Sequence, residues 1–334
     1  MDLKAIEKFF STQAKFRFKQ MQKLLFQDLI DNWSQASVLP LVLRDELNKK
    51  YPLIIPGDLF LSRDQKSAKA LVALEDGNSV ETALMVHSGK RNTVCLSSQL
   101  GCPLACQFCS SGQSFKRNLT WEEILKQVFF WQRYLKSKKL GPLTNVVFMG
   151  SGEAFLNYDQ VFKAIRYLNQ AEYFNISSRK ISISTIGLVP GIRRMAQEKI
   201  KVNLSLSLHF LDDKLRSEIM PGTKKYPLAQ VFQALDFYIE KTNRKVMLEY
   251  LIIKDLNDSV AEAKKLADFI GRKSLYIINI IRYNETGRFK APDRKTILNF
   301  KKVLEKRGLE VIERFRFNQD VQGACGQLAN KYNN

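Results

Sequence analysis

The feature that most constrains the fold is a regular alternation of β-rich runs and amphipathic helical runs that begins near residue 90. Candidate strands lie at residues 93–97, 145–149, 180–184, 202–208, 245–253, 276–281 and 309–315. The clearest helices between them are 121–135, which Thr120 and Glu123 open as a capping box, and 259–270, which Gly271 ends. Strands separated by helices imply parallel pairing, because a parallel return needs a crossover. The alternation predicts an α/β protein and favours a partial or full (β/α) barrel over a flat doubly wound sheet, which the spacing alone leaves open.

A basic segment with a helical pattern precedes this alternation. Residues 1–60 carry Lys15, Lys19 and Lys23 at four-residue intervals beside an apolar stripe, and Pro56-Gly57 forms a turn near their end. Two β-rich runs then flank Asp76-Gly77-Asn78 and predict a hairpin. We expect a helical accessory domain at 1–60, a β-hairpin linker at 61–90, the barrel at 91–318 and a C-terminal segment at 319–334.

The net charge of +20, from 53 Lys and Arg against 33 Asp and Glu, predicts a polyanionic partner. Nucleic acid is favoured over an anionic membrane surface because no basic amphipathic helix stands apart as an anchor, and the alternative is that the charge only aids solubility. No run approaches the ~18 apolar residues of a membrane helix. Charged residues such as Asp2 and Lys4 occupy the place of a secretory signal's apolar core, so we expect a cytoplasmic protein.

Four of the five cysteines lie within residues 95–109, which points to metal or redox chemistry rather than to a disulfide framework. Thiolates at Cys102, Cys106 and Cys109 could hold three irons of a cubane cluster and leave the fourth iron open to a ligand. The alternatives are a structural zinc with Cys95 or His87 as fourth ligand and a redox dithiol at Cys106 and Cys109.

The three cysteines, with Phe108 before the last, resemble those of the radical S-adenosylmethionine (SAM) superfamily. Neighbouring segments resemble the RlmN/Cfr family of RNA adenine methyltransferases over nearly the whole chain. They are CLSSQLGC at 95–102, FKRNLT at 115–120, FMGSGE at 148–153, ISTIG at 183–187, LSLH at 206–209, EIMP at 218–221 and ACGQL at 324–328.

The resemblance implies a [4Fe–4S] cluster on Cys102, Cys106 and Cys109, with SAM on the fourth iron. It places the methionine end of SAM against Gly152 and Glu153, where a carboxylate beside glycines allows an ammonium group to approach closely. The alternative for this segment is a glycine turn with Glu153 as a helix cap. The other positions that match cofactor contacts are Ser184, Ser207, Leu208, His209 and Asn284.

The chemistry implied by the resemblance is a covalent relay. Cys325 takes a methyl group from one SAM molecule, and a 5′-deoxyadenosyl radical from a second SAM removes hydrogen from that S-methyl group. The methylene radical adds to the adenine ring, and Cys95 releases the methylated base by forming a disulfide with Cys325. Glu81 matches the family's proposed proton acceptor, whereas on sequence alone it reads as a solvated strand carboxylate.

The implied substrate is carbon 2 of an adenine in the peptidyl-transferase region of 23S rRNA, with a tRNA adenine beside the anticodon as a further substrate. Carbon 8 of the same rRNA adenine, which would confer antibiotic resistance, stays open because several residues depart from the common pattern. These are Ser151, Ala154, Arg282, Glu285 and Gln322-Gly323. A non-catalytic iron–sulfur RNA-binding protein is the alternative of another class, and the presence of both Cys95 and Cys325 argues against it.

The target adenine must be unstacked before its ring carbon can react, so we expect a flipped base or partly unfolded RNA. Candidate phosphate contacts are Lys15, Arg17, Lys19, Lys23, Lys116, Arg117, Arg193, Arg194, Lys224 and Lys225. As further partners we expect a low-potential electron donor such as flavodoxin or ferredoxin, and no membrane; we expect the protein to be a monomer.

Overall fold

A ten-stranded mixed sheet forms the centre of the protein in a computed structural model that describes residues 1–89, 91–271, 275–314 and 326–328. Its strands are, in spatial order, β1 (Gly57–Leu61), β2 (Ser67–Ala73), β3 (Ser79–His87), β4 (Arg91–Leu96), β7 (Asn145–Phe148), β8 (Ile181–Thr185), β9 (Asn203–Ser207), β10 (Val246–Ile252), β11 (Tyr276–Arg282) and β12 (Val311–Glu313). Neighbours from β1 to β4 pair antiparallel, and neighbours from β4 to β12 pair parallel. The predicted α/β class and parallel order are therefore confirmed.

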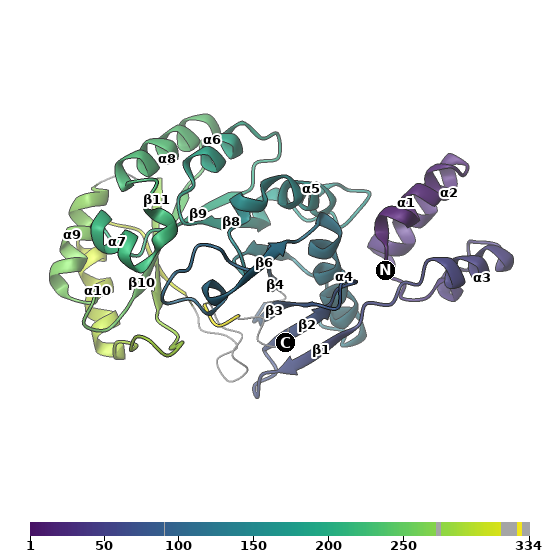
Figure 1. Cartoon of the computed structure of the whole chain (residues 1–334), viewed down its shortest axis with the longest axis horizontal. Coiled ribbons are helices and arrows are strands. Elements are labelled where there is room, and N and C mark those ends of the chain that lie inside the picture. Colours follow the sequence, from purple (N-terminus) through teal and green to yellow (C-terminus); the bar gives the residue numbers. More distant parts are fainter. Residues whose placement is uncertain (90, 272–274, 315–325, 329–334) are drawn as a thin grey trace.

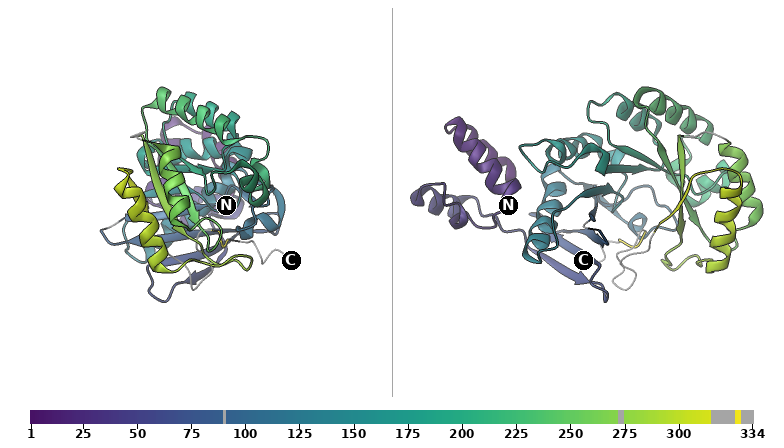
Figure 2. Two further views of the ribbon diagram at one scale, coloured as in Figure 1. Left: turned by 90° about the vertical axis from the view of Figure 1, so that its left-hand side faces the viewer. Right: turned by 180° about the vertical axis from the view of Figure 1, so that it is seen from behind.

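The sheet curves, and helices cover its convex face (Figures 1 and 2). These helices are α4 (Trp121–Ser137), α5 (Tyr158–Asn169), α6 (Val189–Gln197), α8 (Leu228–Thr242), α9 (Val260–Ile270) and α10 (Arg294–Lys306). The shorter α7 (Asp213–Ile219) follows β9 and packs at the carboxyl ends of the strands. Thr120 and Glu123 make both hydrogen bonds of the predicted capping box. Helix α9 begins after Ser259 and ends before Gly271, as expected. No pairing that closes the sheet into a full barrel is found among the described residues.

The two faces of the parallel sheet differ in polarity. Val94, Val146, Ile183, Leu206 and Leu248 are fully buried against the helices, and each contributes roughly 2 kcal/mol to folding. The alternate residues point to the concave face, which carries a polar set of Cys95, Ser182, Ser184, Asn203, Ser207 and Glu249. A parallel sheet with both faces covered by helices would be apolar on both, so the polar concave face marks the side that holds a site.

The N-terminal segment is helical, with α1 (Leu3–Ser11), α2 (Lys15–Gln22), a π-helical turn η1 (Lys23–Gln27), a 3-10 turn η2 (Trp33–Gln35) and α3 (Leu41–Lys50). Its apolar side chains join the core beneath α4 and α5: the Phe26 ring lies 5.1 Å from those of Phe129 and Phe174. β1 begins at Gly57, so the last residues of the segment expected to be helical form a strand instead.

The predicted hairpin is present as β2 and β3, and it continues the main sheet because β3 pairs with β4. A second, two-stranded sheet of β5 (Gln99–Gly101) and β6 (Phe115–Asn118) was not expected from the sequence. Among the described residues, no helix has the length and apolarity needed to cross a membrane.

Candidate cofactor pocket

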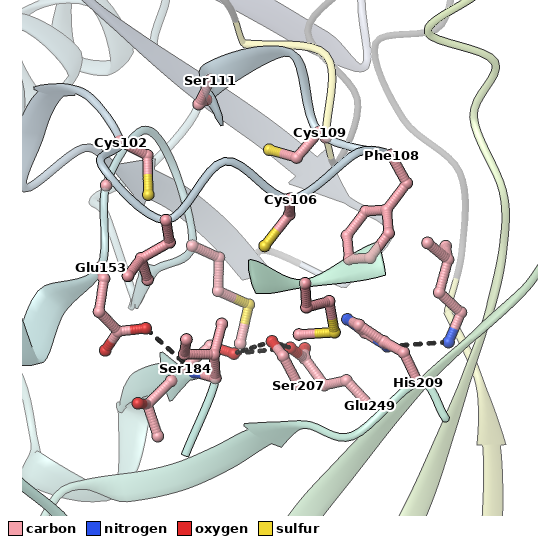
Figure 3. A pocket seen from close by; sticks show the side chains of 18 of the residues that line it. Cys102, Cys106, Phe108, Cys109, Ser111, Glu153, Ser184, Ser207, His209 and Glu249 are labelled. Carbon is pink, nitrogen blue, oxygen red and sulfur yellow. Dashed lines mark hydrogen bonds between the residues drawn. The ribbon is translucent and has the colours of Figure 1, made fainter. Parts of the chain in front are cut away.

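A cavity opens at the carboxyl ends of β7 to β11 (Figure 3). The empty space in and in front of it, including solvent space at its mouth, is about 880 Å³. Eight of the residues predicted to form the site line it: Cys102, Cys106, Cys109, Gly152, Glu153, Ser184, Ser207 and His209. These residues come from four segments of the chain.

The three cysteines lie on the loop between β5 and β6. Gly101 turns the chain into this loop at φ +76°, and a Cβ atom there would lie 1.9 Å from the carbonyl oxygen of Ser114. The Cys102 amide in turn donates to that same Ser114 oxygen at 2.8 Å. The small β5–β6 sheet therefore closes the loop at its base, which directs the three thiol side chains towards the cavity (Figure 3).

Burial makes these thiols hard to ionise without a bound cation. Desolvation raises the pKa of Cys102 to about 12, and it also raises the pKa values of Cys106 and Cys109. A metal centre would supply the missing positive charge, since metal ligation requires thiolates. Three soft donors around one roomy cavity fit an iron–sulfur cluster.

A mononuclear zinc fits this arrangement less well. Among the described residues, no three Cys, His, Asp or Glu side chains surround a point that a single metal ion could occupy. The two candidate fourth ligands do not line the pocket: Cys95 lies on β4, and the His87 ring lies within hydrogen-bond distance of Arg91 (2.7 Å) and Thr93 (3.2 Å).

The glycine turn after β7 places a carboxylate in the pocket wall. Gly152 has φ +103°, and a Cβ atom there would lie 2.6 Å from the side chain of Gln99, whose Oε1 accepts the Glu153 amide at 2.8 Å. The Glu153 carboxylate accepts the amides of Phe155 at 3.1 Å and Ile186 at 3.0 Å. It thus caps the short helix η4 (Ala154–Asn157), as the capping alternative expected.

Capping leaves this carboxylate able to bind a cation as well. Burial raises the pKa of Glu153 to about 7, even though backbone amides stabilise its ionised form. A ligand ammonium group would offset this desolvation and favour the ionised carboxylate. The two interpretations of Glu153 are therefore compatible.

Two predicted serines meet a glutamate that the sequence analysis did not identify. The Ser184 hydroxyl on β8 donates to Glu249 on β10 at 2.7 Å, and Ser207 on β9 lies 3.5 Å from the same carboxylate oxygen (Figure 3). Arg314 pairs with the other oxygen of Glu249 at 3.2 Å. These groups form a partly buried corner whose oxygen acceptors suit the hydroxyls of a ribose. The strand register could have identified Glu249: it pairs with Ser207 on β9, so the two side chains lie on the same face of the sheet.

His209 is held as a neutral ring in the pocket wall. Its Nδ1 accepts the Leu251 amide at 3.1 Å, which leaves the proton on Nε2, and its ring packs edge-on against Phe108. Burial lowers its pKa to about 3. His209 is 5% exposed and lines the cavity.

Arg216 is a second buried residue that the sequence analysis missed. It donates to the carbonyl oxygens of Ile186 at 2.6 Å and Leu208 at 3.2 Å, which lie after β8 and β9. It therefore ties together two loops of the pocket wall. Leu208 itself packs into the hydrophobic core, and Asn284 is buried after β11 without lining the cavity.

The residues predicted to carry the relay lie at different distances from the pocket. Cys95 is on the concave face of β4. Glu81 is only 1% exposed and pairs with Lys69, so its interpretation as a solvated carboxylate is wrong. Cys325 lies outside the described residues, but Gly326, which follows it in the chain, lines the cavity and accepts the Ser110 amide at 2.8 Å.

Several basic residues proposed as phosphate contacts are engaged within the protein. Arg117 pairs with Asp76 at 2.6 Å and Glu123 at 2.7 Å, and Arg194 pairs with Asp159. Lys15, Lys19 and Lys23 are exposed on α2 and η1, as are Lys224 and Lys225 after α7.

Comparison with known proteins identifies the family. Residues 96–270 match the model of the Radical SAM superfamily, whose members use a [4Fe–4S] cluster and SAM. The chain is 39% identical over 329 residues to a probable dual-specificity RNA methyltransferase RlmN from Carboxydothermus hydrogenoformans, covering 96% of this chain and 94% of that one. It is 35% identical to the ribosomal RNA large subunit methyltransferase Cfr from Bacillus velezensis, covering 95% and 92%. A crystal structure of a radical SAM methyltransferase from Sphaerobacter thermophilus superposes with a TM-score of 0.92 at 34% identity, covering 99% and 98%. The chain therefore belongs to the radical SAM superfamily and, within it, to the RlmN/Cfr family of methyltransferases.

Proposed function

We propose that this protein methylates carbon 2 of an adenine in the peptidyl-transferase region of 23S rRNA, with a tRNA adenine beside the anticodon as a further substrate. The observation that carries the proposal is that one cavity gathers the three cysteines, the Gly152–Glu153 turn and the polar strand ends, together with Gly326 next to Cys325. Relatives named RlmN match nearly the full chain, which supports RNA as the substrate.

Each part of the pocket has a role in binding the cofactors. Cys102, Cys106 and Cys109 would hold the cluster, and Glu153 would bind the SAM ammonium group. Ser184 and Glu249 would bind ribose hydroxyls, since their oxygens already lie within hydrogen-bond reach of one another. When bound, the cluster and SAM supply the methyl group and the radical chemistry that an unactivated aromatic C–H bond requires.

The two remaining cysteines would carry the methyl group and release the product. Cys325 would accept the methyl group as a thiolate, and Cys95 would attack the Cys325 sulfur to free the base. Two placements support this assignment: Gly326 lies at the cavity, and Cys95 shares a sheet face with the pocket residue Ser184 through the register of β4, β7 and β8.

The accessory part of the chain would bind RNA. The exposed Lys15, Lys19 and Lys23 lie on α2 and η1. The N-terminal helices lie at one end of the molecule (Figure 1), and the whole chain has a net charge of +20. We propose that residues 1–60 form the RNA-binding accessory domain, that 61–90 join it to the barrel at 91–318, and that 319–334 present Cys325.

One of the residues that kept carbon 8 open, Arg282, does not line the pocket. The Arg282 Nε donates to the carbonyl oxygen of Pro292 at 2.8 Å, whereas its neighbour Ile281 lines the cavity. Arg282 thus points away from the pocket, and its presence does not argue for a different position of attack on the base.

The test follows a labelled methyl group. The reduced full chain, its cluster reconstituted, is incubated with 23S rRNA fragments and SAM carrying a trideuterated methyl group, and peptides and nucleosides are analysed by mass spectrometry. We expect deuterium on Cys325 and in 2-methyladenosine, and neither in Cys325→Ala. RNA binding without label at either place would instead support the non-catalytic iron–sulfur protein.

A further inference from the structure

A buried ion pair lies on the face of the sheet that leads into the pocket. Lys69 on β2 and Glu81 on β3 are 5% and 1% exposed, and the Lys69 Nζ lies 3.7 Å from the Glu81 Oε1. The same ammonium group lies 5.4 Å from the centre of the Phe60 ring on β1. Burying two charges is costly and rarely improves stability over an apolar pair, so a buried pair near a site suggests a role in the chemistry.

The strand register places this pair beside Cys95. One row of partners runs across six strands: Phe60, Lys69, Ala83, Cys95, Val147 and Ser182. Glu81 is two residues from Ala83, so its side chain shares this face and is a diagonal neighbour of Cys95, a relationship that typically spans ~7–8 Å. Lys69 is two strands from Cys95, roughly 10 Å.

We propose that Lys69 is a positioning residue whose ammonium group balances one negative charge shared between Glu81 and Cys95, so that Glu81 can take the Cys95 proton when the methylated base is released. The proton moves from the Cys95 sulfur to a Glu81 oxygen, and the S–H electron pair stays on sulfur. The charge of the face is unchanged, because one anion replaces another opposite the same cation. The thiolate then attacks the Cys325 sulfur and forms an S–S bond, while the bond between that sulfur and the methylene carbon on the base breaks. The electron pair of the broken bond stays with the methylene carbon, which takes a proton and becomes the methyl group, and a thiol reductant later returns the disulfide to two thiols.

The other charged or titratable side chains on the described strands of this face lie farther from Glu81 than Lys69 does. On β1 to β4 these are Asp58, His87 and Arg91; β7 contributes none, and Arg314 lies beyond its end against Met149. His87 and Arg91 contact each other at the far ends of β3 and β4, and Asp58 is two strands from Glu81. Among the strand residues that the structure describes on this face, Lys69 is therefore the cation within 4 Å of Glu81.

The test measures the reactivity of Cys95, which is partly exposed. The reduced full chain is alkylated with iodoacetamide from pH 6 to 9, and the modified Cys95 peptide is quantified by mass spectrometry. Removing a charge at roughly 10 Å changes a thiol pKa by about one unit at an effective dielectric constant of about 20, or about ten-fold in rate. Lys69→Met should therefore slow Cys95 alkylation about ten-fold at neutral pH, whereas Glu81→Gln, which leaves the ammonium group without its partner, should accelerate it.

The opposite signs separate charge balance from structural damage, which would shift both variants in the same direction. Lys69→Arg should restore the wild-type rate, and Lys66→Met, an exposed lysine next to the same strand, should leave it unchanged. Equal slowing in Lys69→Met and Glu81→Gln, or no change in either, would overturn the proposal. If Lys69→Met does not fold, the acceleration expected in Glu81→Gln decides the question.

This inference rests on the proposed roles of Cys95 and Glu81, but its measurement needs neither RNA nor methylation. An absence of methylated adenine in the wild-type protein would overturn the proposed function and leave the alkylation result standing. If the function holds, Lys69→Met should also accumulate a covalent protein–RNA adduct on denaturing gels, since release is the step that slows.

Discussion

Gly152→Ala should damage both the stability and the cofactor site of this protein. The residue has φ +103°, and a Cβ atom would lie 2.6 Å from Cβ and Cγ of Gln99 and 2.8 Å from its Oε1. An L side chain in this conformation costs about 1–3 kcal/mol. Moving Gln99 also frees the buried Glu153 amide, which loses its 2.8 Å hydrogen bond at a cost of about 1–3 kcal/mol.

The matched control is Gly77→Ala in the β2–β3 turn. Gly77 has φ +80°, but nothing lies within 4 Å of the position that a Cβ atom would take, so this variant carries the backbone strain without the collision. Urea unfolding should therefore show a loss of about 2–6 kcal/mol for Gly152→Ala and about 1–3 kcal/mol for Gly77→Ala. Calorimetric titration should show SAM affinity at least about ten-fold weaker in Gly152→Ala alone, since a displaced Glu153 loses a charge-assisted contact. Equal stability and equal affinity in the two variants would refute this account of the glycine turn.

Three further predictions concern the pocket and the accessory segment. Glu249→Gln should weaken SAM binding about ten-fold in equilibrium dialysis, because a charged acceptor becomes a neutral one; an unchanged affinity would remove Glu249 from the ribose site. His209 has its pKa lowered from 6.5 to about 3, so the unfolded state binds the extra proton between these values. The contribution of the neutral His209 ring to the free energy of unfolding is present above pH 6.5 and is lost as the pH falls towards 3, by up to about 1.4 kcal/mol per pH unit. Urea unfolding at a series of pH values should show this loss in the wild-type protein and a flatter pH dependence in His209→Asn. Changing Lys15, Lys19 and Lys23 together to Gln should reduce the salt dependence of RNA binding in filter-binding assays by up to about three units of slope, and an identical slope would place the RNA elsewhere.

The sequence predicted those helix ends and turns that depend on residues close together in the chain. The Thr120–Glu123 capping box and Gly271 fix the ends of their helices through backbone groups a few residues away. In the hairpin turn Asp76-Gly77-Asn78, the Asn78 amide donates to the Asp76 carboxylate at 3.1 Å. The three pocket cysteines were predicted because their spacing on one loop reflects the geometry of the group they would bind.

What the sequence analysis missed depends on contacts between distant segments. Glu249 reaches Ser184 only because β8, β9 and β10 pair in one particular register, and a shift of one residue would turn it to the helices. Glu81 was expected in solvent because nothing in its own strand reveals Lys69 across the hairpin. The β5–β6 sheet is too short to give a periodic pattern, and its base is set by the Gly101 conformation.

We propose that this pocket methylates carbon 2 of an adenine in RNA. The most direct measurement is mass spectrometry of nucleosides from 23S rRNA fragments incubated anaerobically with the reconstituted full chain, SAM and a reductant, against 2-methyladenosine and 8-methyladenosine standards. We predict 2-methyladenosine, which disappears when Cys325 is changed to Ala. A product of 8-methyladenosine, or no methyladenosine in rRNA or tRNA from protein with an intact cluster, would contradict the account.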